Sequence, residues 1–575
     1  MPVEGKLDPG TVAPSLAALL AEGYRATPDD YEVIRAPEGA LTGDRFRCAV
    51  DLLRAQLRST PTTTGEPVLS VTTGAAPVAL VIAHAALAEG WAYSVLSPSW
   101  PRRYRRAAMD RVPPTLELAE AVVIAAKPDG GEPARPPRQV PDGLLSHLLF
   151  TSGSTGAPRA IGTERRALAH HLNVLRTAFV LGPSDVVLQI APPHLDGSLR
   201  DLLYPSLAGA RIVACGRRDG RADIVSVARQ IVQQPITHVL SVLPSVLFEV
   251  ATQLAEQGEQ ALLVRQIAVS GEALAPRVLS AARRAFPNAT VVNQYGPSET
   301  TMTATRRVVE QGQAFGSYGT NVGYPHPGYQ LRLHHGKAIR ISGPGVARGY
   351  LGDPRATAAA FLPQPGGRGS REYDTGDVGV QTFDGSLVLS GRLDDQVKVL
   401  GHKFSVSAVA AALEALPSVR RAAALWLTAE GQQPRLVAFV VGREPGIGSA
   451  DYQRALAELV PYWMLPNTIE VLVELPLLSN GKLDRQGLLS RVSLPPAAGT
   501  AGPATSAAEA VRAVWSRLLR RRDIDDDDDF FMMGGNSLLA LKAIAESRVV
   551  VPELTVKAFF AEPTVNGILR LRSGS

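Results

Sequence analysis

The first several hundred residues alternate short apolar runs, rich in β-branched residues, with Ala-, Leu- and Arg-rich stretches of helical pattern. Each run is the length of a single strand, and the stretches between them are long enough for helices. The alternation therefore predicts parallel sheets covered by helices, an α/β fold. The predicted strands lie at residues 121–126, 185–191, 211–215, 237–243 and 290–296.

The pattern changes in the last part of the chain. From about residue 321, short runs such as "YQLRLHH" and "KAIRIS" are separated by turn residues and predict an antiparallel β portion. A smaller segment of mixed α and β pattern follows, and Leu494–Ser506 has the Pro, Ala, Gly and Thr content of a linker. We expect α/β structure in residues 1–393, a small α+β segment in 394–490, a linker in 491–505 and an all-helical domain in 506–575.

Composition and charge narrow the class of protein. The 575 residues are 45% hydrophobic and 20% charged, which is enough for sizeable cores. The net charge is only +5 with Arg and acids interspersed, so we expect no nucleic-acid partner.

Cys48 and Cys215 cannot form a disulfide framework and favour a reducing compartment. With no signal pattern and no apolar run of membrane-spanning length, we expect a cytoplasmic protein without a membrane partner. The longest apolar stretch, around "PVALVIAHAALAEG", is typical of a buried strand or helix.

A loop of small residues follows an apolar strand end in "LLFTSGSTGAPRAI", residues 148–161. Glycines let backbone N–H groups converge on one point, and hydroxyls add donors, which is how proteins cradle phosphate oxygens. The Gly-Lys-Ser/Thr ending of a Walker loop is missing, and a flexible Ser/Gly turn is the alternative interpretation of this stretch taken alone. The residues concerned are Thr151, Ser152, Gly153, Ser154, Thr155 and Gly156.

Further stretches follow this loop in order: "NQYGPSETT" at 293–301, "YDTGDVG" at 373–379, "GRLDDQVKVLGHKF" at 391–404, "LPLLSNGKLDR" at 475–485 and "FFMMGGNSL" at 530–538. Together they resemble the adenylate-forming superfamily, and more closely the amino-acid adenylation domains of nonribosomal peptide synthetases. The last stretch is similar to the attachment site of a peptidyl carrier domain. The resemblance implies a large N-terminal adenylation subdomain, a mobile C-terminal subdomain and a four-helix carrier domain.

Ser537 stands where that resemblance places the serine that receives a phosphopantetheine arm from a separate transferase. Such a serine needs exposure and no neighbouring base, because another enzyme supplies the chemistry. An N-cap role on the following apolar stretch is compatible with this. A nucleophile elbow is excluded, because Leu539 stands where a second glycine is required.

The resemblance also implies ATP and Mg²⁺ as cofactors and assigns roles around them. Glu299 would hold Mg²⁺ against the phosphates, and Lys482 would bridge the substrate carboxylate and phosphate as the transition state gains charge. Arg159 stands where the family usually has Lys, and Ala160 where it usually has Gly. The other expected ATP contacts, besides the glycine-rich loop, are Asn293 and Tyr295 at the base, Asp377 and Arg392 at the ribose, and Gly296.

In this family the C-terminal subdomain swings between adenylation and thioester formation. Asp394 occupies the hinge position, and Gly401 lies in the segment that would line the pantetheine tunnel. A side chain at Gly401 would obstruct that tunnel.

"APPHLDGSLRDLL", residues 191–203, aligns with a further core motif of the family. Asp196 falls at the position that binds the substrate α-ammonium, which favours an α-amino acid over a fatty, aryl or keto acid. Arg200 either faces the substrate side chain, where it would suit a carboxylate, or points to solvent or pairs with Asp201. The pocket positions implied by the alignment are Gly197, Arg200, Ser241, Ala268, Ser270, Gln294, Met302 and Thr303. Their polarity favours a small polar or acidic substrate.

Neither a condensation motif nor a thioesterase motif is evident, so we expect a loading didomain that charges its own carrier. Its partners would be a phosphopantetheinyl transferase and a downstream condensation or tailoring enzyme, with a small activator protein as a further candidate. Two alternatives stay open. The first is an acyl- or aryl-CoA ligase, against which Asp196 and the carrier motif speak. The second is an inactive docking scaffold, against which Glu299, Asp377 and Lys482 speak.

Overall fold

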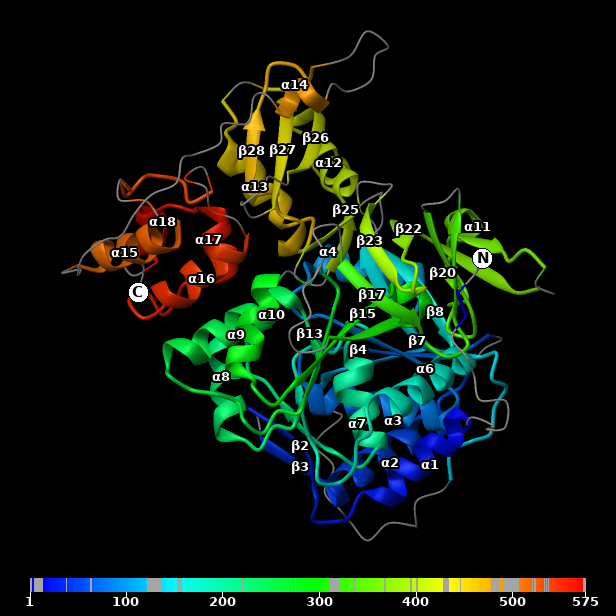
Figure 1. Ribbon diagram of the computed structural model, residues 1–575. Coiled ribbons are helices and arrows are strands. Elements are labelled where there is room, and N and C mark those ends of the chain that lie inside the picture. Colours follow the sequence, from blue (N-terminus) through cyan, green and yellow to red (C-terminus); the bar gives the residue numbers. More distant parts are fainter. Residues whose placement is uncertain are drawn as a thin grey trace. The chain divides into compact units, whose positions relative to one another are not determined.

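In a computed structural model the chain divides into two compact units (Figure 1). One comprises residues 1–98, 108–151 and 159–394, and the other comprises residues 99–107, 152–158 and 395–575. The structure describes residues 3–4, 14–37, 39–62, 65–120, 136–152, 158–218, 221–272, 274, 276–309, 320–334, 338–366, 369–392, 396–399, 402–427, 434–444, 446–476, 485–489, 506–519, 521, 524–531, 533, 535 and 537–571. The predicted strand at 121–126 lies outside the described residues.

The larger unit is built on a long mixed sheet with the strand order β1-β18-β19-β22-β23-β17-β16-β15-β14-β13-β9-β10-β2-β3, with β21 paired to β22. Its strands are β1 (Val3–Glu4), β2 (Glu32–Ala36), β3 (Gly39–Thr42), β9 (Val186–Gln189), β10 (Arg211–Ala214), β13 (His238–Val242), β14 (Gln266–Ser270), β15 (Thr290–Tyr295), β16 (Thr305–Val309), β17 (Thr320–Pro325), β18 (Gln330–His334), β19 (Ala338–Ser342), β21 (Phe361–Pro363), β22 (Arg371–Gln381) and β23 (Leu387–Arg392).

The centre of this sheet confirms the predicted α/β pattern. Strands β10, β9, β13, β14 and β15 pair in parallel, and they include four of the five predicted runs. Beyond β16 the pairs β17–β23, β18–β19, β19–β22 and β22–β23 are antiparallel, as the change of spacing after residue 321 predicts. The helices α8 (Ile224–Gln233), α9 (Pro244–Glu256) and α10 (Pro276–Ala285) lie side by side (Figure 1).

A second sheet has the order β20-β8-β7-β5-β4-β6. Its strands are β4 (Val68–Thr72), β5 (Ala92–Leu96), β6 (Leu116–Leu118), β7 (Leu145–Ser152), β8 (Pro158–Glu164) and β20 (Gly349–Leu351). Strands β4 to β7 are parallel, whereas β20 pairs antiparallel with β8. The glycine-rich loop connects β7 to β8, so it follows the carboxyl end of a parallel strand, where ligand sites of α/β sheets form.

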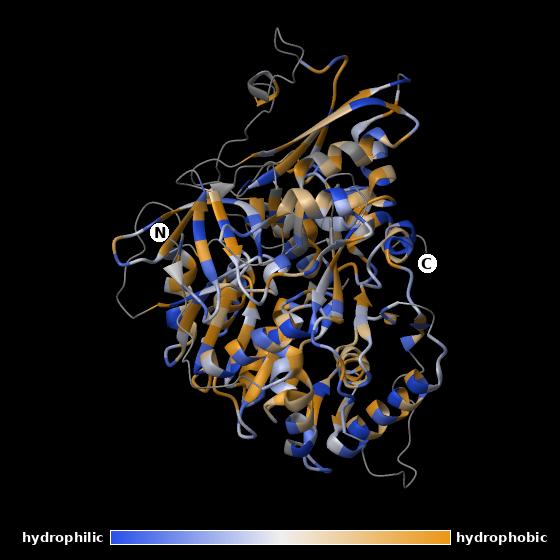
Figure 2. Ribbon diagram, turned by 90° about the vertical axis from the view of Figure 1, so that its right-hand side faces the viewer, coloured by the Kyte–Doolittle hydropathy of each residue, from blue (hydrophilic) through white to orange (hydrophobic). Residues whose placement is uncertain are grey.

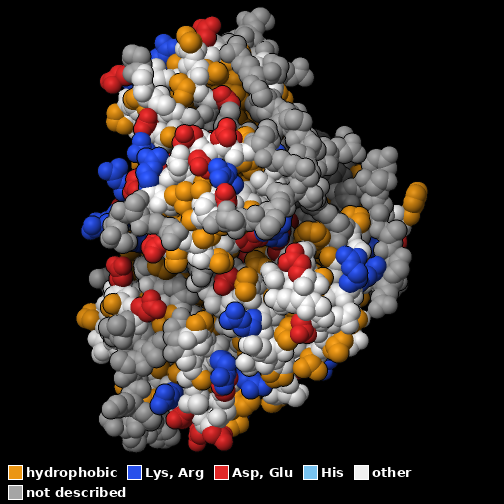
Figure 3. Space-filling view, turned by 90° about the vertical axis from the view of Figure 1, so that its left-hand side faces the viewer, with side chains coloured by type: hydrophobic (Ala, Val, Ile, Leu, Met, Phe, Trp, Pro, Cys, Tyr) orange, Lys and Arg blue, Asp and Glu red, His pale blue; other side chains and the backbone are white. Residues whose placement is uncertain are grey.

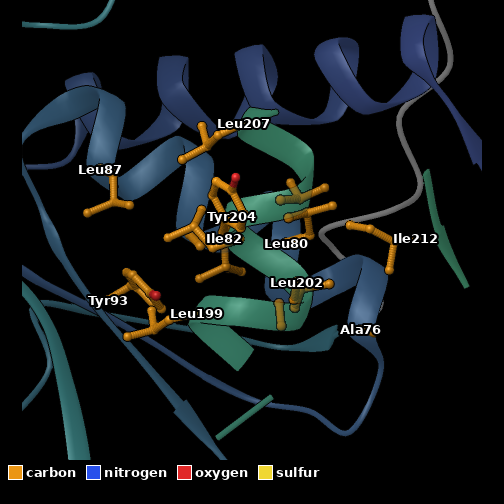
Figure 4. Close-up of a cluster of buried hydrophobic side chains, with 14 of the residues drawn as sticks. Ala76, Leu80, Ile82, Leu87, Tyr93, Leu199, Leu202, Tyr204, Leu207 and Ile212 are labelled. Carbon is orange, nitrogen blue, oxygen red and sulfur yellow. The ribbon is translucent and has the colours of Figure 1, made fainter. Parts of the chain in front are cut away.

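The apolar stretch near residue 80 is helix α3 (Ala76–Glu89), and every residue of it is buried. A helix that is hydrophobic all round belongs in a core. The same core cluster contains residues of α1 (Leu16–Ala26), α2 (Gly43–Ser59), α6 (Arg165–Ala178), the π-helix η1 (Leu199–Leu203) and α7 (Tyr204–Leu207). Leu80 and Ile82 of α3 lie in one cluster with Leu199, Leu202 and Tyr204 of η1 and α7 (Figure 4). This core fixes the η1 segment, which carries site residues.

The smaller unit contains the hairpin β24 (Gln396–Val399) and β25 (His402–Ser405) and the sheet β26 (Val419–Leu427), β27 (Arg435–Gly442) and β28 (Thr468–Val471). With α12 (Val406–Glu414), α13 (Ser449–Ala457) and α14 (Arg485–Leu489), this is the expected small α+β segment. The end of the chain forms helices α15 (Ala507–Leu519), α16 (Ser537–Ser547), α17 (Val556–Ala561) and α18 (Val565–Arg570). Trp515, Phe530 and Phe559 pack together among them.

The remaining described elements are α4 (Arg102–Arg111), β11 (Arg217–Arg218), β12 (Arg221–Ala222), the 3-10 turns η2 (Ser298–Thr300) and η3 (Tyr462–Met464), and α11 (Pro354–Ala360). Figure 2 shows apolar residues concentrated on the strands of the sheets and on one side of many helices. On the face drawn in Figure 3, acidic and basic side chains are interspersed rather than gathered by sign. None of the described helices has both the length and the hydropathy needed to cross a membrane.

Candidate active site

Polar side chains gather at the carboxyl ends of three neighbouring parallel strands. Ser270 of β14 is paired in register with Gln294 of β15, and Ser241 lies on the adjacent strand β13. Ala268, two residues before Ser270, is fully buried in the apolar core. Expected pocket positions from three strands therefore meet at one edge of the sheet.

Arg200 points into this group and is fully buried. Its Nε donates to Ser241 Oγ at 3.1 Å, Nη2 donates to Ser270 Oγ at 3.0 Å, and Nη1 donates to Gln294 Oε1. All three acceptors are pocket positions implied by the alignment. The guanidinium therefore points toward these three side chains and not to solvent. Burial lowers the pKa of Arg200 to about 10, so the guanidinium stays charged at neutral pH.

The π-helix η1 explains this orientation. Its leucines Leu199 and Leu202 enter the core beside α3, while Arg200 turns toward the strand ends. Single π-helical turns are rare and are found mostly at functional sites. The carboxylate of Asp201 turns away from the pocket; its Oδ2 accepts the backbone N–H groups of Ile190 and Ala191 at 2.9 and 2.8 Å. These bonds hold the chain that leads from β9 into the Asp196 turn.

Asp196 lies in the turn before η1 and is half-buried. Its Oδ2 accepts a hydrogen bond from Ser298 Oγ at 2.5 Å. The neighbouring Gly197 has its carbonyl bonded to Ser241 Oγ at 2.8 Å, and a Cβ on it would lie 2.7 Å from the Cβ of Ala191. The carboxylate is thus held next to the polar strand ends by residues far away in sequence.

The turn after β15 brings further expected pocket positions to the site. A Cβ on Gly296 would lie 2.5 Å from the Cα of Thr303, so only glycine allows this close approach. Thr301 and Met302 have φ values of 55° and 77°, in the left-handed region that non-glycine residues seldom adopt. Backbone strain of this kind clusters at functional sites. Met302 and Thr303 are both buried here.

Glu299 is buried in the same turn, and its Oε1 accepts a hydrogen bond from the hydroxyl of Tyr350 at 2.9 Å. The guanidinium carbon of Arg159, on β8, lies 5.1 Å from the centroid of the Tyr350 ring. Tyr350 belongs to β20, which pairs with β8. One tyrosine therefore brings together the acidic and basic residues expected at the phosphates.

The residues expected at the nucleoside come from β15, β22 and β23. Tyr295 donates its hydroxyl to Asp377 Oδ2 at 2.7 Å. Asp377 is paired in register with Arg392 across β22 and β23. Asn293 is buried, and its amide donates to the backbone carbonyl of Asn321 at 2.9 Å. The tyrosine ring and the carboxylate are thus fixed to one another at the end of the sheet.

Several expected residues lie outside the described residues: Gly153, Ser154, Thr155, Gly156, Asp394, Gly401 and Lys482. Thr151 and Ser152 end strand β7, directly before the loop. Ser537 is the first residue of helix α16. Sequence reasoning missed Ser298 and Tyr350, which hold Asp196 and Glu299. Ser298 stood inside a quoted motif, whereas no local signal points to Tyr350.

Comparison with known proteins agrees with this geometry. Residues 20–351 match the AMP-binding enzyme family, and residues 509–571 match the phosphopantetheine attachment site family. The chain belongs to the AMP-binding enzyme family. It is an adenylating ligase with a carrier domain fused at its C-terminal end, in the arrangement of nonribosomal peptide synthetases.

The chain is 29% identical to tyrocidine synthase 3 of Brevibacillus parabrevis over 98% of this chain and 9% of that protein. It is also 27% identical to gramicidin S synthase 2 of Brevibacillus brevis over 82% of this chain and 11% of that protein. It therefore spans only a small part of the length of these curated relatives. Among solved structures, a holo NRPS protein containing adenylation and PCP domains, bound to a vinylsulfonamide inhibitor, has the same fold. Its TM-score is 0.75 at 24% identity, with 98% of this chain and 97% of that chain covered.

The enzyme uses ATP with Mg²⁺ and a covalent phosphopantetheine group, and the described residues fit them. Glu299 is a buried carboxylate beside the loop-bearing sheet, the hard oxygen donor that Mg²⁺ prefers. No group of three acidic, His or Cys side chains among the described residues would hold a metal by itself. Mg²⁺ is commonly bound by one or two carboxylates together with substrate phosphates. Ser537 at the start of α16 suits the phosphopantetheine group.

Proposed function

We propose that the chain activates a small polar or acidic α-amino acid with ATP and loads it onto its own carrier domain. The observation that carries the choice of substrate is the buried guanidinium of Arg200, held by Ser241, Ser270 and Gln294 at the pocket positions. A buried cation disfavours a basic side chain, and the polar groups around it favour a substrate that can accept hydrogen bonds.

In the proposed reaction, an oxygen of the amino-acid carboxylate attacks the α-phosphorus of ATP and pyrophosphate leaves. Asp196 would bind the substrate α-ammonium, with Ser298 orienting its carboxylate. Lys482 and Arg159 would offset the negative charge that develops as two anions meet, and Glu299 would hold Mg²⁺. Tyr295, Asp377 and Arg392 would hold the nucleoside, with Asn293 at the base, and the glycine-rich loop would hold the phosphates.

The second half of the proposal concerns the carrier domain. Ser537 would receive the phosphopantetheine group from a separate transferase. Residues 394–490 would move about Asp394 between the two half-reactions, with Gly401 lining the path of the thiol. Residues 491–505 would be the linker and 506–575 the carrier. A downstream condensation or tailoring enzyme would accept the product, and a small activator protein would be a further partner.

Substrate-dependent ATP–pyrophosphate exchange tests the proposal. The purified chain would be assayed with the common amino acids, hydroxylated and acidic variants, and aryl and fatty acids, with Lys482→Ala as the inactive control. We expect strong exchange with one small polar or acidic α-amino acid. Exchange only with acids that lack an amino group would refute the role of Asp196 and favour a CoA-ligase-like enzyme. Exchange with a large aromatic amino acid would refute the role of Arg200.

A further inference from the structure

Two buried histidines close to the pocket have ring nitrogens without a protein partner. His171 of α6 is fully buried, and among the described residues neither its Nδ1 nor its Nε2 has a hydrogen-bond partner. The same holds for Nε2 of His326, which is 1% exposed. A buried polar atom without a partner costs about 1–3 kcal/mol and calls for an explanation.

The fold places the backbone of His326 beside the expected pocket positions. The backbone N–H of His326 donates to the carbonyl of Ala304 at 2.8 Å, directly after the pocket residue Thr303. The rings of His326 and His170 flank Tyr329, with centroids 6.4 and 5.5 Å from it. His170 precedes His171 on α6, so this helix meets the chain that follows β17 beside the pocket.

Both histidines lie within the electrostatic reach of Arg200. Burial, together with the positive charges of Arg306 and Arg200, lowers the pKa of His326 to about 3. Burial likewise holds the pKa of His171 well below its ordinary value, with His326 and Arg200 contributing. Both rings are therefore neutral at pH 7, and each carries one N–H donor.

Arg200 keeps donors that the described residues do not use. A guanidinium has five N–H groups, and three of them bond to Ser241, Ser270 and Gln294. The two remaining N–H groups are one on Nη1 and one on Nη2. Gln294 Nε2 and Thr303 Oγ1 are also buried without a partner in the part of the chain that the structure describes. The pocket is rich in donors, which indicates a ligand rich in acceptors.

We propose that the side-chain end of this pocket is an anion site, in which Arg200 binds the carboxylate of an acidic amino acid and His171 and His326 complete the wall as specificity residues. The inference rests on the proposed function and narrows its substrate to an α-amino acid with a side-chain carboxylate. The side-chain amide of Asn or Gln would place an NH₂ donor against other hydrogen-bond donors, and this mismatch disfavours binding of the amide.

Paired isosteres test the inference. The full-length chain would be titrated calorimetrically with L-aspartate, L-asparagine, L-glutamate and L-glutamine, and pyrophosphate exchange would be measured with the same four. We expect one acid to be preferred over its amide by about a hundredfold or more, because a site built for one hydrogen-bonding group strongly rejects the wrong one. Equal binding of acid and amide, or preference for the amide, would overturn the inference, even with the proposed adenylation intact.

Variants of the histidines separate a specificity role from a structural one. His171→Leu and His326→Leu should each reduce the acid-to-amide ratio about tenfold, the equivalent of one modest hydrogen bond. His171→Gln keeps a hydrogen-bond donor, so its acid-to-amide ratio should lie between those of His171→Leu and the unchanged chain. It also serves as the test variant if His171→Leu folds poorly. The matched control is His84→Leu, because His84 is equally buried and bonds to Ser206 Oγ at 2.8 Å, and burial alone, without Arg200, lowers its pKa. Ratios that fall equally in the control, or remain unchanged in both histidine variants, would refute the role of the histidines.

Discussion

The carboxylate of Asp196 is held by Ser298 Oγ at 2.5 Å, a hydrogen bond that fixes it before any substrate arrives. Ser298→Ala should raise the KM for the amino acid about tenfold, because a hydrogen bond to a charged group contributes about 1.5–3 kcal/mol. The KM for ATP should not change. Asp196→Ala should raise the amino-acid KM further, since it removes the counterion itself. Pyrophosphate exchange at varied amino-acid and ATP concentrations measures both, and an effect of Ser298→Ala confined to ATP would contradict this assignment.

Single residues differ in how far their positions could be predicted from the sequence. The alignment selected Ser241, Ser270 and Gln294 as polar pocket residues, and the structure brings them together around one side chain. It left the direction of Arg200 open, because that direction depends on the π-helix, which no local pattern encodes. Tyr350 was missed because it reaches Glu299 only through the pairing of β20 with β8.

Among the elements, the hairpin β24–β25 is fixed by a stacked pair of rings. His402 of β25 stacks on Trp463 with a centroid distance of 3.5 Å and an interplanar angle of 8°. Trp463→Ala should increase hydrogen exchange across residues 396–405, because truncating a buried Trp costs about 3–5 kcal/mol. Trp463→Phe should retain most of the protection, since it keeps a stacking partner. Unchanged exchange in the alanine variant would show that the hairpin is held by other contacts, such as buried Phe404.

Some helices and strands could be predicted from a sequence pattern, and others could not. The β-branched runs became β9, β10, β13 and β15 because parallel strands are apolar on both faces. The apolar stretch near residue 80 remained ambiguous between strand and helix, because a segment buried on all sides has no periodicity to read. Its length of 14 residues decides for a helix.

For the whole molecule, the motifs predict the order of the domains along the chain, but they do not predict which strands pair at the edges of the sheets. β1, at the start of the chain, pairs antiparallel with β18, and β2 pairs with β10. These partners are far apart in sequence, and the choice of a distant strand partner depends on the packed fold. None of the quoted family motifs lies in the first hundred residues, yet these residues supply α3 and much of the core.

The buried histidines of the larger unit make its stability sensitive to acid. Burial lowers the pKa of His84 and His194 to about 3, against an ordinary value of 6.5. Below pH 6.5 the unfolded chain takes up protons that the folded chain does not, so the free energy of unfolding should fall as the pH decreases from about 6.5 to about 3. Each such histidine contributes about 1.4 kcal/mol per pH unit in this window.

His84→Leu isolates one of these contributions. The variant should be less stable than the natural chain at pH 7, because Ser206 Oγ loses its hydrogen bond with His84 and keeps only the one to the carbonyl of Leu203. Its stability should nevertheless fall less steeply between pH 6.5 and 4. The difference in slope should correspond to about one proton, measured from the calorimetric unfolding transition of the larger unit at a series of pH values. An identical pH dependence in both proteins would mean that His84 already takes up its proton in the folded state, which its complete burial beside Phe46 argues against.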